Sequence, residues 1–242
     1  IWAKRAAWHQ ISDRPIIETR GLANDLIILA SDNAQDEITR ILALWSLEGI
    51  KHYDQNLMKT LLNSRSDNLR REAVRAVQSF PLSATVLASL LKKPSTDSNP
   101  MVRSQVLRTL EAVNTANPET IGLLVGACKA PLEGNAMGGS YERNFERFLA
   151  RKALENYPKE LLDFIRSPAA AQYEVSNVIW ASQALPKEQK EQVFVDLWKK
   201  NSLNDLDEVT FVLIAEMLEN RNVLNLVSPI LGNENKAVEH VS

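Results

Sequence analysis

Apolar residues recur at intervals of three and four positions along most of the chain, which is the spacing of one face of an α-helix. No stretch alternates apolar and polar residues over the length of a strand. Three dipeptides, Asn99-Pro100, Asn117-Pro118 and Ser167-Pro168, place a capping side chain before a proline that fits the first turn of a helix. The pattern predicts an all-α fold with helices over 1–11, 16–31, 36–49, 54–63, 67–79, 83–93, 100–114, 118–129, 141–156, 158–166, 169–184, 187–200, 206–220 and 222–231.

Part of this pattern repeats, and three segments align without gaps at Arg40, Arg70 and Arg103. An apolar pair follows each arginine three and four residues later, and another apolar residue follows one turn further on. These apolar positions are Ala43, Leu44 and Leu47; Ala73, Val74 and Val77; and Val106, Leu107 and Leu110. The arginines are 30 and 33 residues apart, a period typical of stacked helical hairpins that share one core. Lys4 heads a more divergent earlier copy with Ala7, Trp8 and Ile11.

The repeat predicts a single array over residues 1–242, a right-handed superhelical solenoid of about seven antiparallel helix pairs. Residues 1–130 form its regular part and 141–242 its divergent part. Between them, segment 131–140 holds three of the eight glycines and is predicted to be a loop. Such a loop either contacts a partner or simply connects two subarrays.

The segments Asp36–Gly49, Asn68–Val77 and Asn99–Leu110 resemble the first helices of HEAT repeats, which are related to armadillo repeats. The resemblance implies that the arginines at 40, 70 and 103 bridge neighbouring repeats. Ala43–Gly49, followed by Tyr141–Glu155, is similar to the HEAT segment of bacterial extracytoplasmic proteins that join a sorbosone-dehydrogenase-like propeller to a c-type cytochrome domain. This similarity implies a periplasmic or extracytoplasmic location. It also implies a parent oxidoreductase whose redox chemistry lies outside these residues.

Composition narrows the range of functions. The 28 basic and 30 acidic residues give a net charge of −2, so no overall basic field favours nucleic acid. No apolar run approaches the length of a membrane span, and we expect no membrane insertion. The single cysteine, Cys128, excludes an internal disulfide without fixing the compartment. The chain begins at Ile1 without methionine, and we expect a mature form or a fragment of a larger protein.

Signals for catalysis or cofactor binding are weak. None of the three histidines, His9, His52 and His240, has a second ligand at the spacing that places two side chains on one helix face, so no metal site is predicted. Cys128 ends an apolar helix and is expected to be buried. No glycine-rich phosphate loop is present, and no cofactor is predicted. The five tryptophans fall within apolar stripes and are expected to fill the core, although Trp2 is also placed to contact a preceding domain.

Two sets of residues are candidates for binding a protein partner or a neighbouring domain of the same chain. The first lies on second helices of the repeat and comprises Lys59, Asn63, Ser89 and Lys92. The second lies on the helix after the glycine-rich loop and comprises Tyr141, Arg143, Arg147 and Arg151. In the second set, arginines recur every four residues beside Glu142 and Glu146. This pattern indicates either a binding stripe or a solvated face with intrahelical ion pairs.

We therefore expect a non-catalytic helical-repeat scaffold that binds another protein or domain through many weak contacts. The alternative is an enzyme or ligand-binding helical array, lyase-like or DNA-repair-like, with a site on its concave face. A basic groove or a convergent acid–base pair would favour the alternative, and the sequence shows neither.

Overall fold

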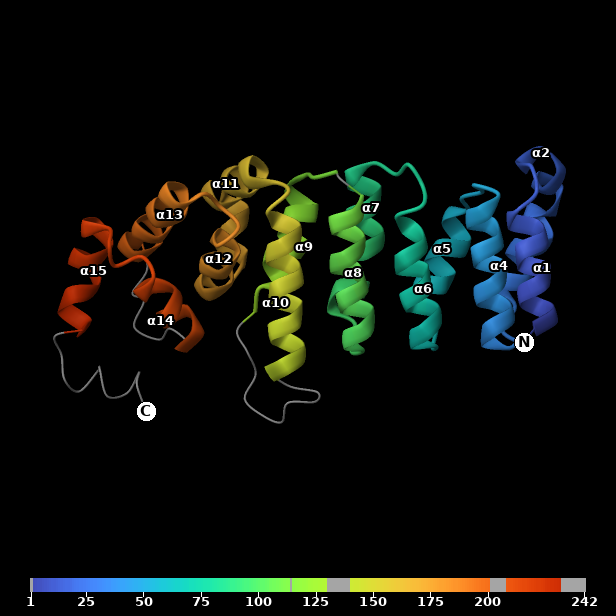
Figure 1. Cartoon of the computed structure of the whole chain (residues 1–242), viewed down its shortest axis with the longest axis horizontal. Helices are drawn as coiled ribbons and strands as arrows, with labels where there is room; N and C mark the ends of the chain where they lie inside the picture. The colour runs from blue at the N-terminus through green and yellow to red at the C-terminus, as the bar shows by residue number, and fades with distance from the viewer. Residues whose placement is uncertain (1, 114, 130–139, 201–207, 232–242) are drawn as a thin grey trace. The chain divides into compact units, whose positions relative to one another are not determined.

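The computed structural model describes residues 2–113, 115–129, 140–200 and 208–231, and over these residues the fold is helical without a strand (Figure 1). The predicted all-α class is confirmed. The chain divides into two compact units, residues 1–115 (unit 1) and residues 116–242 (unit 2). Most predicted helices begin and end within two residues of the observed ones.

Unit 1 is built from helices joined by short turns. Its α-helices are α1 (Trp2–Ser12), α2 (Ile16–Thr19), α3 (Ala23–Ser31), α4 (Glu37–Gly49), α5 (Gln55–Leu62), α6 (Asp67–Val77), α7 (Ala84–Leu91) and α8 (Pro100–Ala112), with 3-10 turns η1 (Arg20–Leu22) and η2 (Pro94–Thr96). Helix α4 packs against α1 and α6, and α6 packs against α8 (Figure 1). Helices α3 and α5 contact each other, and they also pack against α4 and α6 respectively.

The repeated apolar positions form the core of unit 1. In α4, α6 and α8, the three apolar residues that follow each repeated arginine are at most 2% exposed. Each helix begins at an equivalent cap: the side chains of Asp36, Ser66 and Asn99 accept a hydrogen bond from a backbone N–H in the first turn. The second helices α5 and α7 are capped in the same way by Asp54 and Ser83. Local capping and the apolar pattern therefore place the same side chains at the same depth in each copy.

Unit 2 includes the segment 141–242 that the sequence predicts to be divergent. Its helices are α9 (Pro118–Ala127), α10 (Ser140–Leu154), α11 (Pro158–Arg166), η3 (Pro168–Gln172), α12 (Val175–Ser182), α13 (Lys187–Lys200), α14 (Glu208–Ala215) and α15 (Arg221–Leu231). Asn117 caps α9 in a capping box with Thr120. Helix α12 contacts α9, α10, α13 and α14, and α13 packs against α15. One buried cluster includes Ile179 of α12, Phe194 of α13 and Val223 of α15.

Three predicted helices differ from the observed ones. The helix predicted over 16–31 is interrupted by the 3-10 turn η1, which contains Gly21, the residue with the weakest preference for a helix interior after proline. The helix predicted over 206–220 is observed only as Glu208–Ala215. The helix predicted over 169–184 begins at Val175, because Tyr173 and Glu174 are extended.

Tertiary packing explains the late start of α12. The extended backbone at Tyr173 brings its ring against the glycine face of α9, where a Cβ on Gly122 would lie 2.7 Å from the tyrosine hydroxyl oxygen. A Cβ on Gly126 would lie 3.1 Å from the same ring. The ring also packs against Phe164, with centroids 5.8 Å apart. The helical pattern in the sequence contains no signal for this contact.

Gly49 provides a test of the α1–α4 packing. A Cβ at this position would lie 3.2 Å from the Cα of Ser12 and 2.7 Å from its Oγ. We expect Gly49→Ala to lower the free energy of unfolding by about 1–3 kcal/mol, because the backbone of α1 cannot move away without opening the contact. Urea denaturation followed by circular dichroism measures the change.

Gly21→Ala is the matched control, because no atom lies within 4 Å of a Cβ placed on Gly21. It should leave stability unchanged or raise it by up to about 1 kcal/mol. Equal stability of the two alanine variants would contradict the close approach of α1 and α4.

Candidate functional site

Helices α1, α4, α6 and α8 are the first helices of the helix pairs in unit 1. Polar contacts join the N-terminal end of each to the N-terminal end of the next. Each pair links residues 29–32 positions apart in sequence, which is about one repeat. The pairs are Lys4 with Asp36, Ser66 with Glu37, and Asn99 with Asp67. The hydrogen bond from Lys4 is the main cause that holds the pKa of Asp36 well below its ordinary value. The N-terminal ends of α1, α4, α6 and α8 are therefore tied in series.

Arg70 and Arg103 make a second set of repeated contacts. Nη1 of Arg70 donates to the carbonyl oxygens of Ser64 (2.9 Å) and Arg65 (3.2 Å), in the turn before its own helix. Nη1 of Arg103 donates to the equivalent carbonyls of Asp97 (2.7 Å) and Ser98 (3.1 Å). Both arginines therefore brace the turn that leads into their own helix.

Arg70 also bridges to the next repeat. Its Nε and Nη2 donate to the two carboxylate oxygens of Asp97 at 2.7 and 2.9 Å. The two side chains are only 15% and 10% exposed. Burial acts to raise the pKa of Asp97, but the hydrogen bonds from Arg70 and the Asn99 amide outweigh it and leave the pKa below its ordinary value. This bidentate pair is a fixed and charged contact between repeats.

A cluster centred on Arg75 links α4 to α6. The guanidinium donates to Glu72 at 2.8 Å and to Glu48 at 3.1 Å. Trp45 donates from its indole nitrogen to Glu72 at 3.0 Å, and Ser79 donates to Glu48 at 2.7 Å. Burial acts to raise the pKa of Glu72, yet the bonds from Arg75 and Trp45 leave it lowered. Arg75 is therefore a shared partner of the two carboxylates and ties α4 to α6.

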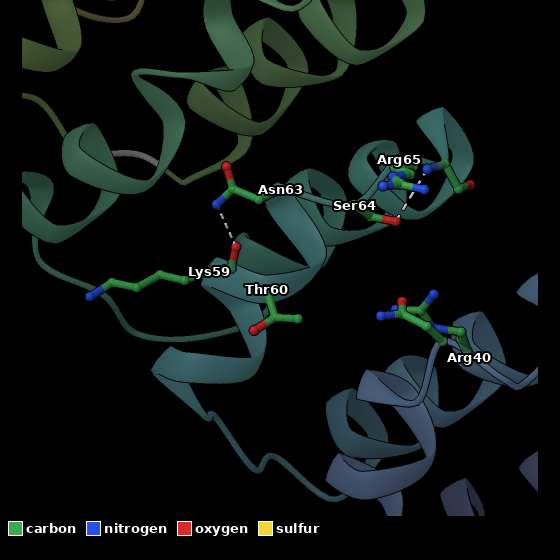
Figure 2. A pocket seen from close by; sticks show the side chains of 8 residues that line it. Arg40, Lys59, Thr60, Asn63, Ser64 and Arg65 are labelled. Atoms are coloured by element: carbon green, nitrogen blue, oxygen red, sulfur yellow. Dashed lines mark hydrogen bonds between the residues drawn. The ribbon is translucent and has the colours of Figure 1, made fainter.

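An open cavity of about 880 Å³ lies in unit 1 between the start of α4 and the turn that joins α5 to α6 (Figure 2). Each lining residue has a polar or basic side chain, and none of them is a carboxylate. The lining residues are Asn33, Arg40, Lys59, Thr60, Asn63, Ser64, Arg65 and Ser66. Figure 2 shows the Arg40 guanidinium pointing into the space bounded by Thr60 and Ser64, while the Lys59 side chain extends away from it. This cavity is the candidate site.

The structure brings together half of the first predicted set. Lys59 and Asn63 both line the cavity, and the Asn63 side chain accepts a hydrogen bond from Lys93. Ser89 and Lys92 are exposed on and just after α7 and do not line it. Sequence reasoning assigned Arg40 a structural role only and missed Ser64 as a site residue. The alignment of the repeats contains a signal for both, since Ser64 stands where the following repeat has Asp97.

The second predicted set does not form one exposed stripe. Arg147 is 0% exposed, and its guanidinium carbon lies 4.0 Å from the ring centroid of Trp180, whose indole donates to the Arg147 carbonyl oxygen at 3.1 Å. Glu146 is 2% exposed. The prediction that Arg147 lies on the surface is therefore wrong, because α12 covers this face of α10. Figure 1 places the two helices in the same part of unit 2.

The other members of that set differ from Arg147. Arg151 is partly exposed and lies 3.5 Å from Glu155, an intrahelical pair one turn away. The side chains of Tyr141 and Arg143 lie outside the described residues, as does the predicted loop up to residue 139.

Trp2 also differs from its prediction. Its side chain is 85% exposed, so the expectation that all five tryptophans fill the core is wrong at this position. Helix α1 has no buried residue, because it packs against the rest of unit 1 on one side only.

Other kinds of site find no support in the described part of the chain. Within it, histidine, cysteine, aspartate and glutamate do not gather in groups of three or more that could hold a metal ion. None of the helices described is long and apolar enough to cross a membrane. Cys128 is 0% exposed, and burial raises the pKa of its thiol to about 12 although the charge of Arg147 acts in the opposite direction.

Comparison with protein-family models, with curated proteins and with solved structures finds no match to this chain. The function is therefore inferred from the geometry of the chain itself.

The Arg70–Asp97 pair predicts a specific pH dependence. The folded-state pKa of Asp97 lies below its ordinary value of 3.8, so its contribution is complete above about pH 5 and is lost as the pH falls through the folded-state pKa. We expect Asp97→Asn to lower the free energy of unfolding by about 2 kcal/mol at pH 7, with a difference from wild type that shrinks below about pH 4. Urea unfolding at about pH 7 and about pH 3 measures both differences.

Asp25→Asn, an exposed carboxylate on α3 of the same unit, is the control. It should change stability by less than about 0.5 kcal/mol. A pH-independent effect of Asp97→Asn would argue that the carboxylate is not held by Arg70.

Cys128 is predicted to be unreactive in the folded chain. Its Sγ lies 3.4 Å from the Leu124 carbonyl oxygen, and thiolate, the reactive form, is scarce at about pH 8. We expect the thiol to react with Ellman's reagent at least about 100-fold more slowly in the native chain than in urea. Release of one equivalent of thionitrobenzoate at the same rate in both conditions would show that unit 2 opens readily around α9.

Proposed function

We propose that this chain is a helical-repeat scaffold, HEAT-like in its first unit, that binds another protein or a neighbouring domain. The observation that carries the proposal is the series of polar contacts at an offset of about one repeat. They include the paired helix starts and the Arg70–Asp97 bridge. Such contacts hold consecutive hairpins in a fixed stack, as stacked arrays require.

The same offset recurs in unit 2. Trp180 donates to the carbonyl of Arg147, 33 residues earlier, and Lys187 bonds Glu219, 32 residues later. Asn220 donates to Glu191, 29 residues earlier. The divergent half of the sequence therefore has contacts between successive helix pairs of the kind found in unit 1, which favours a repeat origin for both. We propose on this basis that the helix pairs of each unit stack as a solenoid.

A binding role suits the charged groups of unit 1. Most of the buried acids and bases are paired with one another, as in the Arg70–Asp97 bridge and the Arg75 cluster. These groups hold helices together and are occupied. Lys59 and Lys92, by contrast, are exposed on the second helices and are available to contact a partner. A partner that meets these lysines would carry complementary acidic groups.

Site-specific photo-crosslinking tests the proposal. Benzoylphenylalanine is placed at position 59 or 92, and at the exposed position 3 of α1 as a control, in the full-length protein within its source cells. We expect the same partner protein to crosslink from positions 59 and 92 and not from position 3. Mass spectrometry identifies the partner, which is then purified for binding measurements.

A charge-reversal pair then measures the contribution of the surface. Lys59→Glu with Lys92→Glu should weaken binding of the purified partner by about tenfold or more, mainly through slower association. Lys159→Glu with Lys199→Glu, at exposed positions of unit 2, introduces the same charge change and should leave affinity within about threefold. Equal weakening by both pairs, or no position-specific crosslink, would refute the proposed binding surface.

A further inference from the structure

Arg40 and Arg70 occupy equivalent positions in successive repeats, and one difference between their surroundings is the residue that each faces in the following repeat. Arg70 faces Asp97, which stands six positions before the arginine of the following repeat, Arg103. The residue six positions before Arg70, which therefore corresponds to Asp97, is Ser64. The first of these two arginines thus faces a serine where the second faces a carboxylate.

The turn itself is the same in the two copies. Oδ1 of Asp97 accepts a hydrogen bond from the N–H of Asn99 at 2.9 Å, and Asn99 caps the next helix. Oγ of Ser64 accepts from the N–H of Ser66 at 3.2 Å, and Ser66 likewise caps its helix. Serine and aspartate form the same local turn. Ser64 therefore replaces the turn-forming oxygen of Asp97 but supplies no carboxylate to the arginine.

The cavity of about 880 Å³ lies beside Arg40, and Ser64 is part of its wall. Arg40 is 7% exposed, and its Nε is occupied by the Ala30 carbonyl oxygen at 2.9 Å. Its terminal nitrogens point into the cavity (Figure 2). No carboxylate of the described residues forms an ion pair with Arg40. Arg65 is a second basic residue of the lining, whereas the Lys59 side chain extends away from the cavity.

Asp32 is the acidic group that interacts with Arg40 through its charge. The backbone N–H of Ala34 and the side-chain amide of Gln35 are the main causes of its lowered pKa, and the charge of Arg40 lowers it further. Its two carboxylate oxygens are held by these groups at 2.8 and 3.1 Å, and it does not line the cavity. Asp32 partly balances the charge of Arg40 without occupying the position that Asp97 takes beside Arg70.

We propose that the Arg40 cavity is a carboxylate-binding site in which an external carboxylate takes the place that Asp97 fills in the next repeat. A guanidinium can pair with a carboxylate through two parallel hydrogen bonds. Arg70 does so with Nε and Nη2, whereas Arg40, whose Nε donates to the Ala30 carbonyl oxygen, has its two terminal nitrogens for this pairing. The Ser64 hydroxyl, whose oxygen accepts in the turn, is a further donor on the cavity wall. The carboxylate comes from an acidic side chain of the protein partner, a step that rests on the function proposed above.

A titration of the isotope-labelled full chain followed by nuclear magnetic resonance tests the site. The probes are sodium glutarate, a capped tri-glutamate peptide and its tri-glutamine counterpart. Glutarate and the tri-glutamate peptide should cause saturable shifts of the amides of Ser64, Arg65 and Ser66 and of the Arg40 Nε–H. The tri-glutamine peptide should cause none, because it has the same length but no carboxylate.

Ser64→Asp is the decisive variant, because it places in the chain the carboxylate that the proposal assigns to the ligand. The substitution keeps a turn that Asp97 already forms, so the fold is expected to persist. It should raise the melting temperature and weaken tri-glutamate binding by about tenfold or more, through occupation of Arg40. Ser64→Ala leaves the cavity open and should bind within about threefold of wild type.

Asn24→Asp adds the same charge at an exposed position of α3 outside the cavity and controls for general repulsion. It should bind like wild type. If Ser64→Asp and Asn24→Asp weaken binding equally, or if neither glutarate nor tri-glutamate shifts the cavity residues saturably, the site is refuted. If only glutarate binds, the carboxylate site stands and its assignment to a protein partner fails.

These outcomes are separable from those of the crosslinking experiment. A partner that binds Lys59 and Lys92 with unchanged affinity for the Ser64→Asp chain supports the scaffold and overturns the carboxylate site as its contact. Saturable glutarate binding without any crosslinked partner supports the carboxylate site and overturns the proposed protein-binding surface.

Discussion

The contacts on which unit 1 depends are made by the arginines near the starts of α4, α6 and α8, which are buried or partly buried. A guanidinium has five donors in a rigid fork, so one side chain can satisfy the carbonyls of its own turn and still reach the next repeat. Arg70 does both, through Ser64 and Asp97. Small and medium apolar residues behind the arginine pack the helices closely enough for this bridge to form. Stacking and polar bridging therefore reinforce each other.

The residue that faces this arginine in the next repeat decides whether the guanidinium is paired with a carboxylate. A buried arginine beside a carboxylate is neutralised and serves only stability. With serine in place of that carboxylate, as at Ser64, the guanidinium lacks this ion pair and faces an open space. A change of one side chain in a structural ladder thus converts a packing contact into a candidate binding contact, with little change in the backbone around it.

In unit 2, two arginines one helical turn apart differ in burial. The four-residue spacing of Arg147 and Arg151 places them on one face of α10. From the sequence alone, this spacing predicts an exposed charged face. Trp180 of α12 covers Arg147 and stacks on its guanidinium, whereas Arg151 remains near solvent and beside Glu155. Cation–π stacking and the hydrogen bond from the indole to the backbone allow a charged side chain to be buried between two helices.

The sequence by itself determined the helices and most of their ends, because caps such as Asp36, Ser66 and Asn99 and the apolar spacing act within a few residues. It also determined that the repeated apolar positions of α4, α6 and α8 are buried, although not that polar residues such as Glu72 and Thr109 are buried with them. Only the tertiary structure decided which residues face the candidate site and which are covered by another helix. Burial of Arg147 depends on Trp180, 33 positions away, and the wall opposite Arg40 is formed by residues 59–66, which are 19 to 26 positions away. Helical periodicity carries no information about such distant neighbours.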